Sequence, residues 1–206
     1  MKNSLYILAR DDSLICRTPD DPQVRRFLIS GIKQMPNIPF HHYLWDDPEK
    51  SSRDFSEFRR QLLGNHLVSK IVKPTVFLVL PEDFSEVDKR ALIEFCMFCG
   101  AHTVHVMPEC LLLSDAAEYV AITRTCRMTV LCLVRQKDIV QTRYLENREY
   151  SEDDMKREIG GLFASGDWGG LPVLLNGEIP DSYRRLGETV PPEAILERFV
   201  EVTRGK

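Results

Sequence analysis

Residues 73–109, KPTVFLVLPEDFSEVDKRALIEFCMFCGAHTVHVMPE, contain the pattern that decides the fold. The run at 75–81 is almost wholly apolar, which is typical of a strand buried on both faces of a sheet. Ser85 and Asp88 have the spacing of a capping box, so a helix is expected to begin there. Gly100 is a natural helix terminator, and a second strand is expected after it. The segment therefore predicts strand, helix and strand, the repeating unit of an α/β layer.

The composition is that of an ordinary globular protein. The chain has 206 residues, 43% hydrophobic and 28% charged, which is enough for one large domain or two small lobes. Its net charge of −4 gives no electrostatic reason to expect nucleic acid. No run approaches the roughly 20 apolar residues of a membrane span, and the N-terminus lacks the pattern of a signal peptide. We therefore expect a cytoplasmic protein with neither a nucleic-acid partner nor a membrane span.

Six cysteines are present, and two of them form a C-x-x-C motif at Cys96 and Cys99. Such a motif could be a redox pair or half of a zinc site. Both cysteines lie inside the helix expected after Ser85, however, and no second pair has comparable spacing. Buried reduced thiols are the favoured interpretation, with zinc or redox chemistry as the alternative.

Patterns outside this segment complete a repeated order of elements. Helices are expected over residues 22–32, 54–68, 151–164 and 192–203, a strand, an aspartate turn and a second strand over residues 4–18, and a β-hairpin over residues 127–145. This order predicts two similar halves. We place the break after residue 124, which gives a first lobe of residues 1–124 and a second, smaller lobe of residues 125–206.

The wording of the central segment also resembles bacterial actin homologues, the rod-shape proteins of the MreB type. In that family a buried strand and a proline precede a pattern like I-T-E-V-E-K-R-A-V, and residues 84–92 here read FSEVDKRAL. The family continues with A-G-A-x-x-V-x-L-I-E-E-P-M-A-A-A, where residues 99–110 read CGAHTVHVMPEC. The match covers residues 70–120, and the order of elements extends it over most of the chain. It implies an actin-like, ribonuclease H-like α/β fold of duplicated lobes, minimal and without the usual inserted subdomains.

The phosphate-binding loops that this resemblance implies are not recognisable. The family's first hairpin carries I-D-L-G-T, but Ile7 stands in place of the acid and Ala9 in place of the glycine. Its second hairpin carries D-I-G-G-G-T, which we match to residues 131–136, LCLVRQ, without acid or glycine. Branched and bulky side chains there would fill the space in which backbone amides approach phosphate. The sequence therefore favours an inactive ATPase, and neither ATP nor Mg²⁺ is expected as a cofactor.

Four residues define a remnant nucleotide-binding cleft under the alternative interpretation. Asp11 and Asp12 follow the expected position of the acid and would lie on the metal side. Glu109 would also lie on the metal side, to coordinate or activate water, and Gly177, which remains from the family's T-G-G-G turn, would lie near the base of the nucleotide. Each residue also has a simpler interpretation: an exposed hairpin turn for the aspartates, a helix cap for Glu109 and a tight turn for Gly177.

Residues 40–52, FHHYLWDDPEKSS, are aromatic and are expected to be irregular and exposed. Phe40, Tyr43 and Trp45 are the candidate interaction surface, because aromatic residues are enriched at binding hot spots. The alternative is a lid that folds back over the core. His41 and His42 could bind a metal only with ligands from elsewhere in the chain, so no metal site is predicted.

Three functions compete. The first is a catalytically inactive actin-like protein that acts as a scaffold or regulator in cell-shape or cytoskeletal assembly, through a protein partner or self-association. The second is a nucleotide-binding ATPase or phosphotransferase with non-standard phosphate loops. The third is a nonenzymatic module of a larger assembly whose α/β layer only mimics the actin pattern, and one continuous sheet in place of two lobes would favour it. The absence of recognisable phosphate motifs favours the first.

Overall fold

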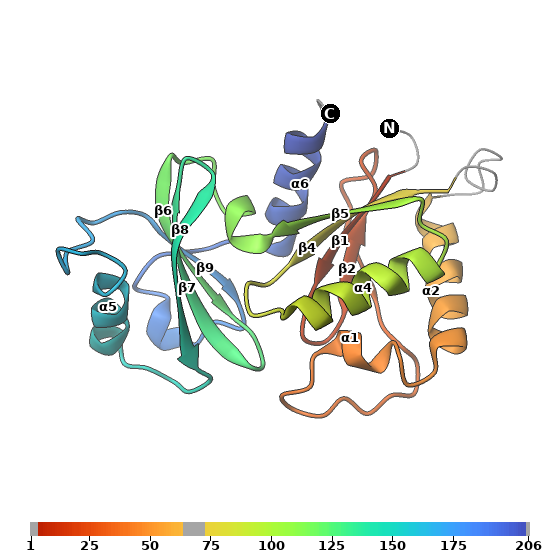
Figure 1. The fold of residues 1–206 in the computed structure, drawn as a ribbon, viewed down its shortest axis with the longest axis horizontal. Helices are drawn as coiled ribbons and strands as arrows, with labels where there is room; N and C mark the ends of the chain where they lie inside the picture. The colour runs from red at the N-terminus through yellow and green to blue at the C-terminus, as the bar shows by residue number, and fades with distance from the viewer. Residues whose placement is uncertain (1–3, 64–72, 205–206) are drawn as a thin grey trace. The chain divides into compact units, whose positions relative to one another are not determined.

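Two mixed five-stranded sheets, each with its own helices, form the fold (Figure 1). The structure is a computed structural model that describes residues 4–63 and 73–204. The chain divides into two compact units: unit 1 comprises Met1–Leu80, Phe84–Met107 and Leu196–Lys206, and unit 2 comprises Pro81–Asp83 and Pro108–Ile195. Two separate sheets do not favour the third hypothesis, for which one continuous sheet would have been the support. The division also differs from the expected break after residue 124, because the strand ending there belongs to the sheet of unit 2.

Unit 1 is built on a sheet with the strand order β3-β2-β1-β4-β5. The strands are β1 (Ser4–Ala9), β2 (Leu14–Arg17), β3 (Arg25–Phe27), β4 (Thr75–Leu80) and β5 (Thr103–Pro108). Among the described residues before β5, the helices are α1 (Phe40–Tyr43), α2 (Pro48–Leu63) and α4 (Glu86–Phe98). β1 pairs antiparallel with β2 and parallel with β4, so it lies at the centre of the sheet.

The central strands of unit 1 are apolar because both of their faces are covered. Leu5 and Ile7 belong to the hydrophobic cluster on one face of the sheet. Tyr6, between them, points the other way, as the two-residue period of a strand requires. Its ring lies 5.6 Å from that of Phe199 in α6 (Pro192–Thr203), and its hydroxyl is 2.7 Å from Thr203 Oγ1. The C-terminal helix is thereby fixed to this sheet.

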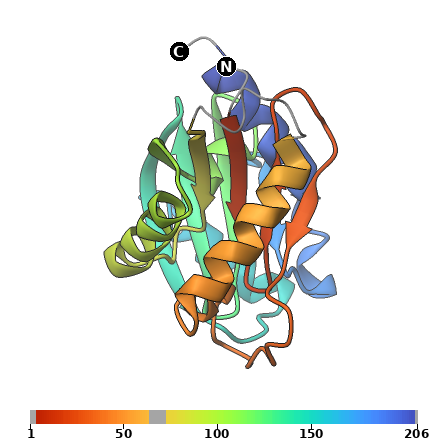
Figure 2. The same ribbon diagram turned by 90° about the vertical axis from the view of Figure 1, so that its right-hand side faces the viewer.

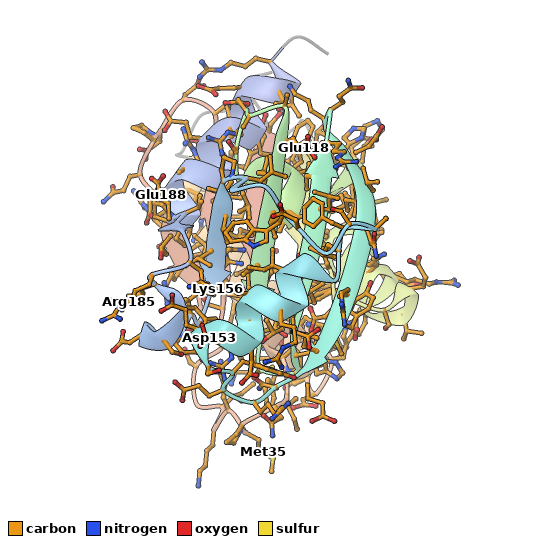
Figure 3. The ribbon with its side chains drawn as sticks, turned by 90° about the vertical axis from the view of Figure 1, so that its left-hand side faces the viewer. Met35, Glu118, Asp153, Lys156, Arg185 and Glu188 are labelled. Carbon is orange, nitrogen blue, oxygen red and sulfur yellow. The ribbon has the colours of Figure 1, made fainter. Side chains whose placement is uncertain are left out.

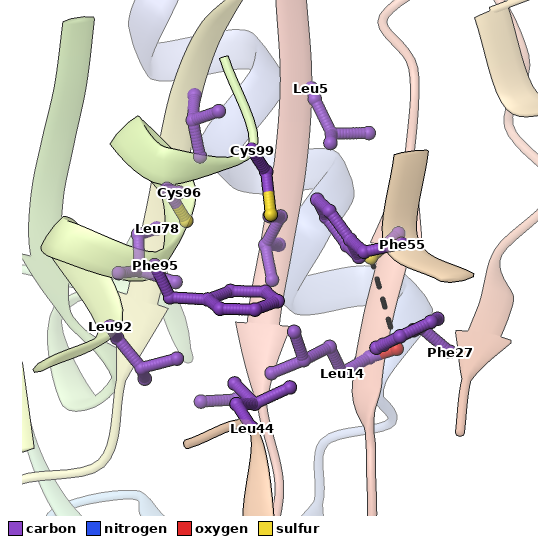
Figure 4. Close-up of a cluster of buried hydrophobic side chains, with 14 of the residues drawn as sticks. Leu5, Leu14, Phe27, Leu44, Phe55, Leu78, Leu92, Phe95, Cys96 and Cys99 are labelled. Atoms are coloured by element: carbon purple, nitrogen blue, oxygen red, sulfur yellow. Dashed lines mark hydrogen bonds between the residues drawn. The ribbon is translucent and has the colours of Figure 1, made fainter. Parts of the chain in front are cut away.

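α2 and α4 lie side by side over the other face of the unit 1 sheet (Figure 2). Phe55 of α2 and Phe95 of α4 contact each other, with ring centroids 5.7 Å apart. Phe27 of β3 packs edge-on against Phe55 at 5.0 Å (Figure 4). These side chains, with Leu14, Leu78 and Leu92, are almost completely buried. The aromatic contacts thus join two helices and an edge strand into one core.

Unit 2 repeats this topology. Its strands are β6 (Glu118–Arg124), β7 (Met128–Arg135), β8 (Asp138–Glu146), β9 (Val173–Gly177) and β10 (Glu188–Thr189), in the order β10-β9-β6-β7-β8. β6 pairs antiparallel with β7 and parallel with β9, as β1 pairs with β2 and β4. Read from β8 to β10, the order is therefore the one seen from β3 to β5. The expected duplication of lobes is confirmed at the level of strand pairing.

The core of unit 2 lies between this sheet and α5 (Glu152–Gly160). Met155 and Ile159 of α5 are fully buried with Val120 and Ile122 of β6. Figure 3 shows α5 crossing the sheet, with the charged side chains of Asp153 and Lys156 on its outer side. Short 3₁₀ helices, Glu109–Leu112 and Asp181–Tyr183, precede β6 and follow β9.

Several local expectations differ from the structure. The helix expected over residues 22–32 is wrong: Arg25–Phe27 form β3, whose pairing with β2 buries Phe27. The segment at 40–52 is helical, with α1 and the start of α2, rather than irregular. The end of the helix expected over residues 54–68 lies outside the described residues. β6 is a strand that we did not expect.

The capping box and the buried thiols are confirmed. Ser85 Oγ accepts a hydrogen bond from the Asp88 amide, and the Asp88 carboxylate accepts one from the Ser85 amide. Burial raises the pKa of the Cys96 thiol to about 12, which favours an inert thiol over a reactive one. All six cysteines are free, and all but Cys126 are buried. Among the described residues, no helix combines the length and the apolar character needed to cross a membrane.

Candidate functional site

The turns after the first strand of each unit occupy equivalent positions in the two sheets. The β1–β2 turn spans residues 10–13, and the β6–β7 turn spans residues 125–127. In the family that the sequence resembles, the two phosphate loops lie in these hairpins. The second loop was expected at residues 131–136, but these residues form the end of β7 and enter the next hairpin. Neither turn contains a glycine.

The β1–β2 turn holds Asp11 and Asp12 by contacts within unit 1. Asp12 Oδ2 pairs with Arg26 Nη1 at 3.1 Å, and both side chains are about half exposed. The Asp12 carboxylate also accepts a hydrogen bond from Ser13 Oγ at 2.7 Å. The Asp11 carbonyl accepts one from the amide of Phe40, at the start of α1. This arrangement fits an exposed hairpin turn closed by its own side chains.

The β6–β7 turn is held by a buried carboxylate from a different part of unit 2. Thr125 Oγ1 donates to Asp83 Oδ2 at 2.7 Å. Arg127 Nε donates to the same oxygen at 3.0 Å, and its Nη2 donates to the Asp83 carbonyl at 3.0 Å. The Asp83 side chain is completely buried, whereas that of Arg127 is 24% exposed. A hydroxyl and a guanidinium, two groups that bind phosphate well in other proteins, here bind the chain's own aspartate.

Gly177 ends β9 beside this turn. Its φ of +86° lies in the left-handed region, which only glycine adopts without strain. A Cβ built on Gly177 would lie 2.0 Å from the carbonyl oxygen of Arg124, so no side chain fits. The amide of Glu178 also donates to that carbonyl, at 3.3 Å. A close backbone approach in a tight turn is sufficient to explain this glycine.

Glu109 is fully buried at the start of the 3₁₀ helix of unit 2. Glu82, in the same unit, accepts a hydrogen bond from the amide of Cys110 at 2.5 Å. Burial, and then the charge of Glu109, raise the pKa of Glu82 from its ordinary 4.5 to about 7. The two glutamates thus form a buried acidic pair, and Gly177 has a different set of neighbours. Asp11 and Asp12 belong to unit 1.

The candidate interaction surface is not uniformly exposed. Phe40 is 1% exposed and Tyr43 8%, and both belong to the core of unit 1. The Tyr43 hydroxyl accepts a hydrogen bond from the amide of Met35 at 2.7 Å. Trp45 is 39% exposed, and its ring lies 6.3 Å from that of Phe95. The expected exposure is wrong for Phe40 and Tyr43, because α1 turns their rings into the core, and Trp45 alone of the three can present an aromatic face.

Two groups of described residues have ligand atoms close enough to hold a metal ion. One consists of Glu82, Cys110 and Cys132 in unit 2, and the other of His41, His42 and Asp88 in unit 1. Hydrogen bonding to Cys132 and burial raise the pKa of the Cys110 thiol far above its ordinary value, which disfavours the thiolate that a metal needs. His41 and His42 are adjacent in the sequence, but Asp88 lies 46 residues after His42, so the sequence pattern does not connect them.

Comparison with known proteins finds similarity by structure but not by sequence. No family model and no curated protein sequence matches the chain. A candidate N-acetylglucosamine kinase from Porphyromonas gingivalis superposes with a TM-score of 0.58 at 10% identity, covering 98% of this chain and 100% of that one. An AlfA filament bound to AMPPNP gives a TM-score of 0.52 at 9% identity, covering 100% and 97%.

MreB5 of Spiroplasma citri bound to ADP is also similar, with a TM-score of 0.46 at 12% identity over 77% of this chain. The chain spans 56% of the length of that MreB5 structure. Two α/β units with the same strand order, together with the AlfA and kinase structures, show the fold: the chain has the duplicated lobes of the actin-like fold. The actin-like fold that the central segment predicted is thereby confirmed.

Proposed function

We propose that this chain is a catalytically inactive actin-like protein that acts through binding, as a scaffold or regulator of a cytoskeletal type of assembly. The β6–β7 turn is the observation that carries the proposal. In this turn the Thr125 hydroxyl and the Arg127 guanidinium both bind Asp83. A phosphate group entering here would have to displace a buried carboxylate from its partners and would be repelled by its negative charge.

The β1–β2 turn supports the same function. Asp12 is paired with Arg26, and the amide of Arg10 donates to the carbonyl of Ser13 at 2.9 Å. Backbone amides that cradle phosphate need a turn in which the chain can approach the ligand closely, which is the usual reason for glycine. This turn contains no glycine, so its sequence does not favour a close approach of backbone amides to phosphate. Glu109, the candidate residue for coordinating or activating water, is fully buried.

Self-association is the form of binding that the structural neighbours suggest. AlfA is a filament in the structures that this chain resembles, at TM-scores of 0.52 and 0.50. Loss of nucleotide binding would leave such a fold with its surfaces for assembly. We therefore expect a protein that pairs with itself or with an assembly partner without a nucleotide-dependent step.

Calorimetric titration with ATP–Mg²⁺ tests the proposal, with AlfA as the positive control. The expected result is no measurable heat of binding and an unchanged melting curve at millimolar ATP–Mg²⁺, because a ligand of the native state raises its melting temperature. Low-micromolar affinity would overturn the proposal and favour the nucleotide-binding alternative. Sedimentation velocity over a range of protein concentrations, with and without nucleotide, then measures self-association. Assembly that requires ATP would contradict the inactive role.

A further inference from the structure

His41, His42 and Asp88 bring three metal-binding side chains to one point in unit 1. The two histidines are consecutive residues of α1. Asp88 is the third residue of α4, after the N-cap Ser85. Consecutive helical residues point about 100° apart, yet the two imidazole rings lie only 4.5 Å apart at their centroids. Both rings therefore turn toward the same place, which is the Asp88 carboxylate.

The distances from Asp88 Oδ1 to the two imidazole nitrogens are close to those in a tetrahedral zinc site. Asp88 Oδ1 is 3.0 Å from His41 Nε2 and 3.3 Å from His42 Nε2. Zinc binds histidine nitrogen and carboxylate oxygen at about 2.0–2.1 Å, so two ligand atoms of a tetrahedral site lie about 3.3 Å apart. The observed separations are close to this value. All three ligand atoms lie within 4.8 Å of one another.

The surroundings hold two of the three ligands in orientation. Asp88 Oδ2 accepts hydrogen bonds from the Ser85 amide at 3.0 Å and from Ser85 Oγ at 2.8 Å. These bonds leave Oδ1 directed at the histidines. The His41 ring packs against Phe84, with centroids 4.5 Å apart. Groups that fix the orientation of ligands in this way are a regular feature of metal sites.

One side of the cluster is open to solvent. The side chain of His41 is 3% exposed and that of Asp88 8%, but that of His42 is 51% exposed. A zinc ion held by three protein ligands keeps a fourth position, which a water molecule from this side would fill.

Both imidazoles approach the same carboxylate oxygen, Asp88 Oδ1, through Nε2. Neutral imidazole is the form in which histidine binds a metal ion, so a divalent ion at this point would be held by two neutral donors and one carboxylate.

We propose that His41 Nε2, His42 Nε2 and Asp88 Oδ1 bind a zinc ion, with water as the fourth ligand. The ion would join α1 to the first turn of α4. It would also stabilise the β1–β2 turn, because the amide of Phe40, at the start of α1, donates to the carbonyl of Asp11 at 2.9 Å. The site uses none of the contacts on which the proposed scaffold function rests, so either can fail alone.

The test is calorimetric titration of the untagged, chelator-treated full chain with zinc chloride. The wild-type protein is expected to bind one zinc ion with micromolar or tighter affinity and to melt at a higher temperature with zinc. His42→Ala removes a half-exposed ligand and is expected to weaken binding at least tenfold while the far-UV circular dichroism stays unchanged. His102→Ala, which removes an exposed histidine of the same unit outside the cluster, is the matched control and should bind as the wild type does.

Cobalt substitution supplies a second measurement. Co²⁺ in the wild-type site is expected to give the intense visible absorption of a tetrahedral ion, and His42→Ala should lose it. Absence of zinc binding at equimolar concentration would overturn the proposal. Equal zinc affinity in His42→Ala and His102→Ala would do so as well, since the ion would then lie elsewhere.

Discussion

Arg127 binds Asp83 twice, through a side-chain bond to the carboxylate and a second bond to the backbone carbonyl, each 3.0 Å long. The arrangement places a positive charge against a carboxylate that is completely buried. It also fixes the start of β7 to the segment that follows β4 in the chain. Asp83 therefore occupies the hydrogen-bond donors of Arg127 that a phosphate-binding turn would offer to a ligand.

Removal of this arginine should destabilise unit 2 strongly. Arg127→Ala would leave Asp83 as a buried charge without its cation, and we expect a loss of about 3 kcal/mol in the free energy of unfolding. The measurement is urea denaturation followed by circular dichroism. Arg184→Ala is the control, because the Arg184–Asp181 pair is exposed, at 69% and 90%, and should contribute less than about 0.5 kcal/mol. Equal effects of the two substitutions would contradict the role of the Asp83 contact.

Gly177 and Gly166 separate two costs of adding a side chain. Both have positive φ, of +86° and +72°, so alanine at either position is strained by about 1–2 kcal/mol. At Gly166 the added Cβ would meet nothing within 4 Å, whereas at Gly177 it would overlap the backbone of Arg124. We therefore expect Gly177→Ala to lower the melting temperature clearly more than Gly166→Ala. Similar melting temperatures in differential scanning calorimetry would show that the close approach is not rigid.

The two serine N-caps, Ser85 and Ser151, should contribute unequally to stability, because one is partly buried and the other is exposed. Ser85→Ala removes the acceptor of the Asp88 amide in a partly buried capping box, and we expect a loss of about 1–2 kcal/mol. Ser151→Ala removes the equivalent bond to the Asp154 amide, which is exposed to solvent, and should lose about 0.5 kcal/mol. Chemical denaturation of both variants measures the difference. The reverse order would show that the cap of α4 is not a strong determinant of stability.

The central layer of unit 1 could be predicted because its signals are local. A wholly apolar strand, the Ser85–Asp88 cap and Gly100 lie close together in the sequence and specify β4 and α4 without reference to the rest of the chain. β3 and β6 could not be predicted in this way. The apolar residues of 22–32 fit helical spacing, and only pairing with β2 makes Arg25–Phe27 a strand. The missed β6 displaced the expected second phosphate loop by one hairpin.

The candidate site was less predictable because its contacts join distant residues. Asp83 binds Arg127 across 44 positions, and His41 binds Asp88 across 47. No spacing rule connects residues so far apart in the sequence. Phe40 and Tyr43 illustrate the opposite difficulty, because an aromatic segment has the same composition whether it faces solvent or the core. Only the position of α1 decides that.

Glu82 should make the stability of the protein depend on pH. Its pKa rises from an ordinary 4.5 to about 7 in the folded chain, first because it is buried and second because Glu109 is near. Between these values the folded state keeps a proton that the unfolded state has released. The contribution of Glu82 to the free energy of unfolding is therefore fully present below about pH 4.5 and is lost as the pH rises to about 7. A shift of this size corresponds to about 2 kcal/mol, after a reduction for the partial exposure of the residue.

Glu82→Gln tests this dependence, because the amide oxygen can still accept the hydrogen bond from the Cys110 amide while the titration is removed. We expect the free energy of unfolding of the variant, measured by urea denaturation from pH 4.5 to pH 8, to fall less steeply than that of the wild type. The variant should also exceed the wild type in stability at pH 8, where the wild-type carboxylate is charged and buried. Glu188→Gln, at an exposed glutamate of the same unit, controls for the change in net charge. If the free energy of unfolding of Glu82→Gln fell with pH as steeply as that of the wild type, another group of the protein would cause the pH dependence.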